Sequence, residues 1–277
     1  MLQSLFIMLR EGLEAALIVG IVLAYLGRTG NRHRFGSIWL GTAAAVVVSL
    51  IAAGLLFALV GGLEGQAEEI YEGAAMLTAV GVLTYMIFWM RQQAVNIKAH
   101  LQAQVETALK GGSSFALALL AFIVVVREGV ESVLFMFAAI RASDPIPASL
   151  GGLLGLAIAI LLGYSLYTGA SRMNLRHFFN ITGVLLIVFA GGLLAVGVHE
   201  WQEAGLIPFG LETAWNINHF LDEKGPLGQV LKALFGYNGN PSVLEAFLHI
   251  AYLVVVLALY FKPGSKTRTT AVSPSSA

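Results

Sequence analysis

The chain lacks cysteine and is poor in charged residues. Lys, Arg, Asp and Glu together make up 12% of its 277 residues, whereas a typical soluble domain carries about 25%. The absence of cysteine excludes disulfides, thiol chemistry and thiolate ligands for soft metals. Basic and acidic residues are equal in number, at 16 each, so no excess of positive charge favours a nucleic-acid partner. The chemistry of the chain must therefore rest on a small number of carboxylate, guanidinium and imidazole groups.

Long apolar runs make up most of the sequence. Hydrophobic residues account for 57% of the chain, and its mean hydropathy is +0.80. About 20 apolar residues form a helix long enough to cross the ~30 Å hydrocarbon layer of a membrane. The sequence therefore predicts an all-α, polytopic membrane protein, with seven transmembrane helices in one domain over residues 1–277. The predicted spans are 4–26, 36–60, 72–90, 115–140, 148–168, 178–198 and 243–261.

The segments on either side of the last span are of a different kind. Residues 199–242 form a long connection, which the seven-span arrangement places outside the membrane. Ser242 and Glu245 fit the capping-box pattern, in which a serine and an acid three residues later close the start of a helix. After Lys262 the sequence is polar and rich in Ser and Thr, so we expect the tail 263–277 to be disordered.

The distribution of Lys and Arg indicates the orientation of the chain. Short connections rich in Lys and Arg face the cytoplasm. Basic residues gather in alternate connections of the seven-span arrangement, which places the N-terminus outside and the C-terminus inside. They are Arg28, Arg32 and Arg34 after the first span, Arg91, Lys98 and Lys110 after the third, Arg172 and Arg176 after the fifth, and Lys262, Lys266 and Arg268 after the seventh.

One charged motif occurs twice inside predicted spans. Residues 10–14 read Arg-Glu-Gly-Leu-Glu, and residues 127–131 read Arg-Glu-Gly-Val-Glu. An ionisable side chain at membrane depth costs about 2.5–3.5 kcal/mol on insertion scales, so such residues usually have a function and a partner. On a helix, the two acids of each motif share a face, and the arginine can pair with the second acid four residues later. The side chains concerned are Arg10, Glu11 and Glu14 in the first motif and Arg127, Glu128 and Glu131 in the second.

The two motifs also indicate an internal repeat. From residue 10 to residue 127 is a shift of 117 residues, and each motif lies in the first of three spans, over 4–90 and 115–198. Because three spans separate the motifs, the two units cross the membrane in opposite directions. Inverted units of this kind are typical of transporters, whose substrate site lies near the midplane where the units meet. The span 243–261 has no counterpart.

The motif side chains suit a hard cation. Four glutamates and two arginines leave a formal charge of −2, and carboxylate oxygens are preferred ligands of Mg²⁺, Ca²⁺, Mn²⁺ and iron. We therefore expect the four glutamates to form one metal site at the midplane, with the two arginines balancing its charge. The alternative is that each arginine pairs with one glutamate and only locks two helices together. The pattern indicates a cation transporter rather than an enzyme, and an exporter of manganese or another hard divalent cation is a second reading.

A second group of acids flanks the predicted outer ends of two spans. Three glutamates precede or open the third span, and a His-Glu-x-x-Glu sequence follows the sixth. Together they could form an outer capture site for a cation. The alternative is a set of solvated acids at the membrane edge. The residues are Glu68, Glu69, Glu72, His199, Glu200 and Glu203.

These features resemble a known family. Two Arg-Glu-Gly-x-Glu motifs, in the first and fourth of seven spans, are similar to those of the oxidase-dependent iron permease family. Residues 6–19 (Phe-Ile-Met-Leu-Arg-Glu-Gly-Leu-Glu-Ala-Ala-Leu-Ile-Val), 88–91 (Phe-Trp-Met-Arg) and 199–205 (His-Glu-Trp-Gln-Glu-Ala-Gly) resemble its bacterial, ferrous-iron branch. The resemblance covers essentially the whole chain.

The resemblance implies a function that spacing and periodicity do not give. It implies an iron permease in the cytoplasmic membrane of a bacterium, with iron as Fe²⁺ or Fe³⁺ as the substrate and no permanently bound cofactor. It also implies extracytoplasmic partner proteins that bind or oxidise iron. The iron-handling groups that it implies are Glu11, Glu14, Glu128 and Glu131.

Overall fold

The computed structural model describes residues 1–262, apart from 94–96, 111–112, 169–173, 224, 226, 229–230 and 233–235. The side chains of 91–93, 97–100 and 175–176 are likewise not described. The predicted disordered tail 263–277, with Lys266 and Arg268, lies outside the described residues, as does Arg172.

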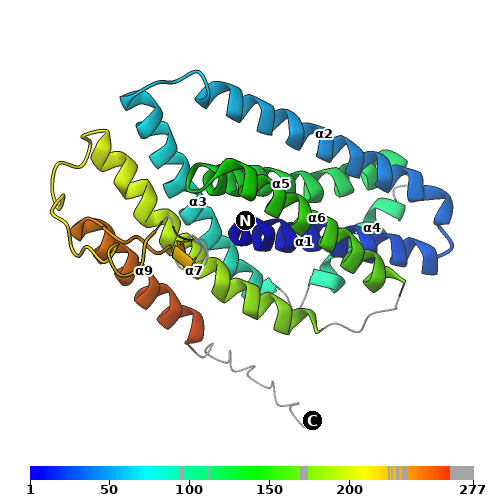
Figure 1. Cartoon of the computed structure of the whole chain (residues 1–277). Helices are drawn as coiled ribbons and strands as arrows, with labels where there is room; N and C mark the ends of the chain where they lie inside the picture. The colour runs from blue at the N-terminus through cyan, green and yellow to red at the C-terminus, as the bar shows by residue number, and fades with distance from the viewer. Residues whose placement is uncertain are drawn as a thin grey trace, which may run out of the picture.

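Long helices form nearly all of the fold, arranged side by side as one bundle (Figure 1). Among the described residues, the only strand-like contact is an isolated bridge between Thr213 and Ser242. In chain order the elements are α1 (Leu2–Arg28), the 3-10 turn η1 (Arg32–Arg34), α2 (Phe35–Val60), α3 (Gln66–Gln93), α4 (Ile97–Lys110), α5 (Ser114–Arg141), α6 (Pro145–Tyr167), α7 (Leu175–Glu203) and α9 (Val243–Phe261).

Each predicted span falls on one of these helices. Five helices, α2, α3, α6, α7 and α9, are long and apolar enough to cross a membrane. The helices α1 and α5 are of similar length, but the motif charges lie in the middle of their apolar stretches. The protein is thus an all-helical, polytopic membrane protein. Several helices extend past the predicted spans, as α3 does to Gln66 and α7 to Glu203, because polar residues continue a helix beyond the apolar stretch.

The predicted capping box at the last span is confirmed. Ser242 is the N-cap of α9, and its Oγ accepts a hydrogen bond from the backbone N–H of Glu245. In return, the backbone N–H of Ser242 donates to Oε1 of Glu245 at 3.3 Å. Two of the N–H groups that a helix start leaves unpaired are satisfied in this way, which fixes where α9 begins.

The closest helix pairs at the centre of the bundle are α1 with α6, α2 with α5 and α3 with α7. On α6, Gly151 and Gly155 face the backbone of Met1 and Leu5 at the start of α1. Because residue numbers rise together along this contact, α1 and α6 run in the same direction.

The second pair has the same geometry. On α2, Gly41 faces the backbone of Ala118 near the start of α5, and further along Ser49 faces Gly129. The helices α2 and α5 are therefore also parallel to each other. In the third pair, Gln66 at the start of α3 donates from Nε2 to the backbone oxygen of Ala204 just beyond the end of α7, at 2.8 Å, so α3 and α7 are antiparallel.

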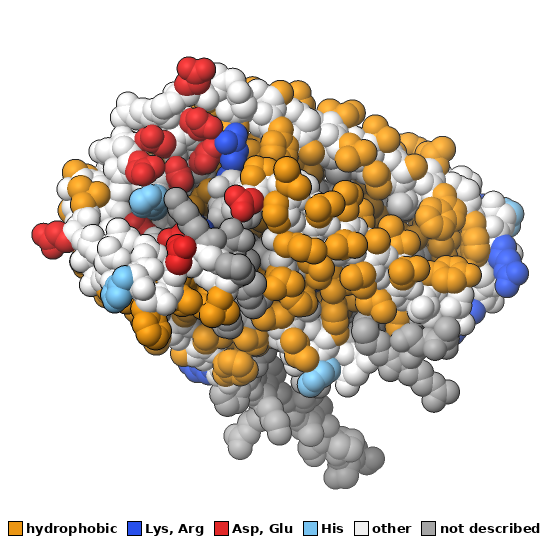
Figure 2. All heavy atoms as spheres, in the orientation of Figure 1, with side chains coloured by type: hydrophobic (Ala, Val, Ile, Leu, Met, Phe, Trp, Pro, Cys, Tyr) orange, Lys and Arg blue, Asp and Glu red, His pale blue; other side chains and the backbone are white. Residues whose placement is uncertain are grey.

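Charged side chains are divided between the two ends of the bundle. Figure 2 shows acidic side chains gathered at the end where α3 begins and α7 ends, with apolar side chains over the middle. At the other end, the connection from α1 to α2 carries Arg28, Arg32 and Arg34. The helix α4 also packs there, with Val105 buried in a cluster that includes residues of α1 and α5. An apolar band between two polar ends is what a membrane requires.

Candidate functional site

The two motif helices meet at the centre of the bundle, where α1 contacts α5. The glycine in each motif lets another helix come close. A Cβ atom at Gly12 would lie 2.8 Å from Cβ of Ala159 on α6. A Cβ atom at Gly129 would lie 2.8 Å from Cβ of Ser49 on α2 and closer still to its Oγ. Real Cβ atoms do not approach other heavy atoms this closely, so both motif glycines are required by packing.

Three of the four motif glutamates converge. One carboxylate oxygen from each of Glu11, Glu128 and Glu131 lies within 4.8 Å of the other two. The side chains of Glu11 and Glu128 are 0% and 2% exposed, and that of Glu131 is 17% exposed. Largely buried carboxylates that converge from two helices form an arrangement that could hold a metal ion.

The motif arginines lie beside these acids. Arg10 Nη1 lies 3.4 Å from Glu11 Oε1, and Arg10 Nε lies 3.2 Å from Glu14 Oε1. In the second motif, Arg127 Nη2 lies 3.0 Å from Glu128 Oε1, and Arg127 Nε lies 3.4 Å from Glu131 Oε1. The predicted pairing four residues apart is present in both motifs, and each arginine also contacts the acid next to it in sequence.

Several buried carboxylate oxygens accept no hydrogen bond from the described residues. They are Glu11 Oε2, Glu14 Oε1, both oxygens of Glu128 and Glu131 Oε2, although Glu14 Oε1 and Glu128 Oε1 have their ion pairs. A buried polar atom without a hydrogen bond costs about 1–3 kcal/mol, and more when it is charged. A bound cation would remove this cost, whereas a purely structural ion pair would leave it in place. These atoms favour the metal-site interpretation over a helix lock.

The fourth motif glutamate has a different environment. Glu14 is absent from the group of converging oxygens, and its Oε1 faces Arg10 instead. The sequence predicted four equivalent glutamates, because spacing along a helix treats the two motifs alike. All four pair with an arginine, but the structure brings only three of them together and leaves Glu14 outside that group.

Sequence reasoning missed two side chains of α3 at this centre. The sulfur of Met86 lies 3.8 Å from Arg10 Nη1. The ring of Trp89 lies under the guanidinium of Arg127, with its centroid 4.5 Å from Cζ. Met86 and Trp89 are three residues apart, so they share one face of the helix. Their presence within an apolar span gave no signal that they would contact the motif arginines.

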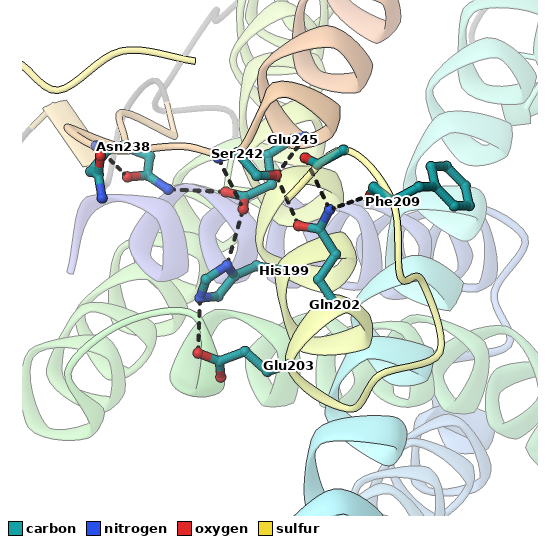
Figure 3. A network of polar contacts seen from close by, with 9 residues as sticks. His199, Gln202, Glu203, Phe209, Asn238, Ser242 and Glu245 are labelled. Atoms are coloured by element: carbon teal, nitrogen blue, oxygen red, sulfur yellow. Dashed lines mark hydrogen bonds and ion pairs between the residues drawn. The ribbon is translucent and has the colours of Figure 1, made fainter. Parts of the chain in front are cut away.

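The outer acids divide into two groups. Arg141, at the end of α5, forms ion pairs with Glu68 and Glu72 of α3. His199 lies between two other carboxylates, with Nδ1 3.0 Å from Glu245 Oε1 and Nε2 3.3 Å from Glu203 Oε1 (Figure 3). The predicted capture residues lie at one end of the bundle, but two of them, Glu68 and Glu72, pair with Arg141, and His199 pairs with Glu245; neither partner was predicted.

Glu245 is the centre of a polar network. Asn238 Nδ2 donates to Glu245 Oε2 at 3.0 Å, and Ser242 Oγ donates to Gln202 Oε1 at 2.8 Å (Figure 3). Gln202 Nε2 in turn donates to the backbone oxygens of Phe209 and Gly210. The network joins the end of α7, the outer connection and the start of α9.

A cavity of about 460 Å³ lies at the same end of the bundle. Helices α1, α5, α7 and α9 and the connection after α7 all contribute to its wall. Gln3 and Phe189 belong to the lining on the α1 and α7 sides. The charged or ionisable lining residues are Arg141, His199, Glu200, Glu223, Lys232 and Glu245.

Comparison with known proteins identifies relatives over nearly the full length. The model of the iron permease FTR1 family matches residues 1–264. The ferrous iron permease EfeU of Yersinia pestis is 36% identical over 275 residues, which cover 99% of this chain and 98% of the relative. The ferrous iron permease EfeU of Escherichia coli O6:K15:H31 is 37% identical over 265 residues, which cover 95% of this chain and 96% of that relative. No solved structure matches the chain.

Proposed function

The chain belongs to the iron permease FTR1 family, and from this premise we propose that it carries iron ions across the cytoplasmic membrane of a bacterium. Iron crosses through a midplane site built from the motif glutamates. The observation that carries this proposal is the convergence of buried oxygens from Glu11, Glu128 and Glu131 within 4.8 Å of one another.

The two charged motifs belong to inverted three-helix units, α1–α3 and α5–α7, with α9 as the seventh span. The packing supports this arrangement. In the proposed repeat, α1 corresponds to α5, α2 to α6 and α3 to α7. The contact of α1 with α6 then corresponds to the contact of α5 with α2, and the contact of α3 with α7 corresponds to itself. The glycine contacts follow the same exchange, since Gly12 faces α6 and Gly129 faces α2. A site at the junction of such units can be reached from either side as the units rock.

The chemistry of the site follows from its charges. Iron takes carboxylate oxygens as ligands, and three of them converge from two helices that belong to different units. With four glutamates and two arginines, the empty site has a formal charge of −2, which a divalent ion neutralises. Glu14 contributes by holding the charge of Arg10. Iron is the substrate of the site, and the protein needs no permanently bound cofactor to bind it.

The acidic end of the bundle faces outward in this proposal, with the N-terminus outside and the basic connections in the cytoplasm. An outward surface rich in acids raises the local concentration of cations. The acids Glu68, Glu69, Glu72, Glu200 and Glu203, with His199, receive iron there. Extracytoplasmic proteins that bind or oxidise iron deliver it to this surface.

Uptake into proteoliposomes tests the proposal. Purified full-length protein should move radioactive iron inward, and Mn²⁺, Zn²⁺ and Mg²⁺ in excess should compete poorly. Glu11→Gln and Glu128→Gln should each lose most of the uptake, because a neutral amide keeps the shape of the side chain and loses its charge. The matched control is Glu106→Gln, whose acid pairs with Lys110 on the exposed surface of α4. Stronger competition by Mn²⁺ than by unlabelled iron would favour the manganese alternative.

A further inference from the structure

The two motif arginines occupy equivalent sequence positions but differ in environment. The Arg10 side chain is 2% exposed, whereas that of Arg127 is 43% exposed. A buried charge costs several kcal/mol in proteins even after relaxation. Arg10 is buried and would be left without a partner, so it cannot leave its acids. Arg127 has room to move.

Arg127 is held on two sides by different kinds of contact. The edge of its guanidinium faces the carboxylates, with Nη2 3.0 Å from Glu128 Oε1 and Nε 3.4 Å from Glu131 Oε1. Its face lies on the indole ring of Trp89, 4.5 Å from the centroid. A planar guanidinium can make both contacts at once, because hydrogen bonds use its edge and cation–π attraction uses its face.

A metal ion would compete with only one of these contacts. Glu128 and Glu131 each supply one of the three converging oxygens. A cation bound to either oxygen of these carboxylates repels Arg127 and shares their negative charge, so their pairs with Arg127 weaken. The contact with Trp89 uses no site oxygen, and it strengthens when the guanidinium leaves the acids and moves further over the ring. Arg10 differs, because besides Glu11 of the converging group it pairs with Glu14, which lies outside that group and keeps hold of Arg10 when a metal binds.

We propose that Arg127 is the displaceable counter-ion of the carboxylate site and that Trp89 positions its guanidinium while Glu128 and Glu131 turn to the metal. This inference rests on the proposed function of the site. In the empty site Arg127 offsets one of the two negative charges of these acids. When iron binds, the guanidinium of Arg127 moves along the face of the indole ring. Its return to the acids competes with the bound iron and so hastens release.

Direct Fe²⁺ binding separates this role from simple packing. The full-length protein in detergent is equilibrated with Fe²⁺ without oxygen, and the bound metal is measured by dialysis. Trp89→Leu removes the aromatic face and should weaken Fe²⁺ affinity roughly 3- to 10-fold, less than the full strength of a cation–π contact because the empty site already has part of it. Trp89→Phe keeps an aromatic ring that attracts a cation less strongly, so its Fe²⁺ affinity should lie between those of Trp89→Leu and the unmodified chain. The matched control Trp39→Leu, at a side chain 55% exposed on α2, should bind Fe²⁺ as the unmodified chain does.

A second pair of variants tests the link to Arg127. Arg127→Gln removes the competing cation, so Fe²⁺ should bind more tightly while the maximal uptake rate falls. In that background Trp89→Leu should have no further effect on affinity. An equal loss of affinity in both backgrounds would show that Trp89 only packs, and would overturn the inference.

The outcomes distinguish the inference from the proposal beneath it. If Glu11→Gln abolishes Fe²⁺ binding but Trp89→Leu binds normally, the role of Trp89 is wrong and the metal site stands. If Glu11→Gln binds Fe²⁺ normally, the metal site itself is wrong. If the Trp89→Leu protein does not elute as a folded particle, the Fe²⁺ affinity of Trp89→Phe tests the role of Trp89 in its place.

Discussion

Arg10 Nε lies 3.2 Å from Glu14 Oε1, and the two side chains are 2% and 4% exposed. This pair makes Glu14 different from the other motif glutamates, because its carboxylate supports a buried charge rather than the converging oxygens. Removing one member of a buried ion pair leaves the other uncompensated, which typically costs about 3–5 kcal/mol.

Glu14→Gln should therefore act mainly on stability. We expect its unfolding free energy to fall by about 3 kcal/mol, because Arg10 keeps only the pair with Glu11. Fe²⁺ affinity should fall less than in Glu11→Gln. Thermal unfolding in detergent and Fe²⁺ dialysis measure the two effects. Equal loss of affinity in Glu14→Gln and Glu11→Gln, with unchanged stability, would mean that all four glutamates are ligands.

The close approach at Gly129 gives a packing prediction. Gly129→Ala should separate α5 from α2 and reduce stability by about 1–3 kcal/mol, as overpacking does. The matched control is Gly54→Ala on α2, where no atom lies within 4 Å of the added Cβ; there the higher helix propensity of alanine should leave stability unchanged or slightly raised. Thermal unfolding compares the two variants. Partial recovery on adding Ser49→Ala would identify the Ser49 hydroxyl as the obstacle.

The network around Glu245 predicts how the outer connection is held. Glu245→Ala removes the acceptor used by His199, Asn238 and the backbone of Ser242. We expect a protease added from outside to cut the 204–242 connection faster in this variant, because its ties to α7 and α9 are weakened. Glu212→Ala, at an exposed acid in the same connection, is the control and should be cut at the normal rate. Equal cutting rates in the two variants would show that the network does not restrain the connection.

The orientation of the chain can be tested because it contains no cysteine. We expect a cysteine at Asn216, in the outer connection, to react with a membrane-impermeant reagent in intact cells. A cysteine at His33, between α1 and α2, should react only after the membrane is opened. Both positions are exposed, so accessibility across the membrane decides the result. Labelling of both in intact cells would contradict the outward N-terminus and the inverted units that depend on it.

The sequence by itself determined the class of protein, the helices and the motif. Apolar length predicted where long helices lie, and the predicted helix 243–261 coincides with α9 because Ser242 and Glu245 specify its start. The pairing of each arginine with the acid four residues later also followed from helix geometry, since both partners lie on one helix. These features depend on residues close together in the chain, where spacing fixes distance.

Only the tertiary structure decided which side chains from different helices meet. The sequence repeats one motif, yet Glu131 joins the converging oxygens while Glu14 holds Arg10. Trp89 lies in a segment that the sequence linked only to a family resemblance, and Met86 lies just before it; both reach the arginines because α3 packs beside α5 and its side chains extend to α1. Likewise, Glu245 meets His199 of α7, and Arg141 meets Glu72 of α3. Such contacts depend on how helices cross and rotate, which a helical period of about 3.6 residues does not encode.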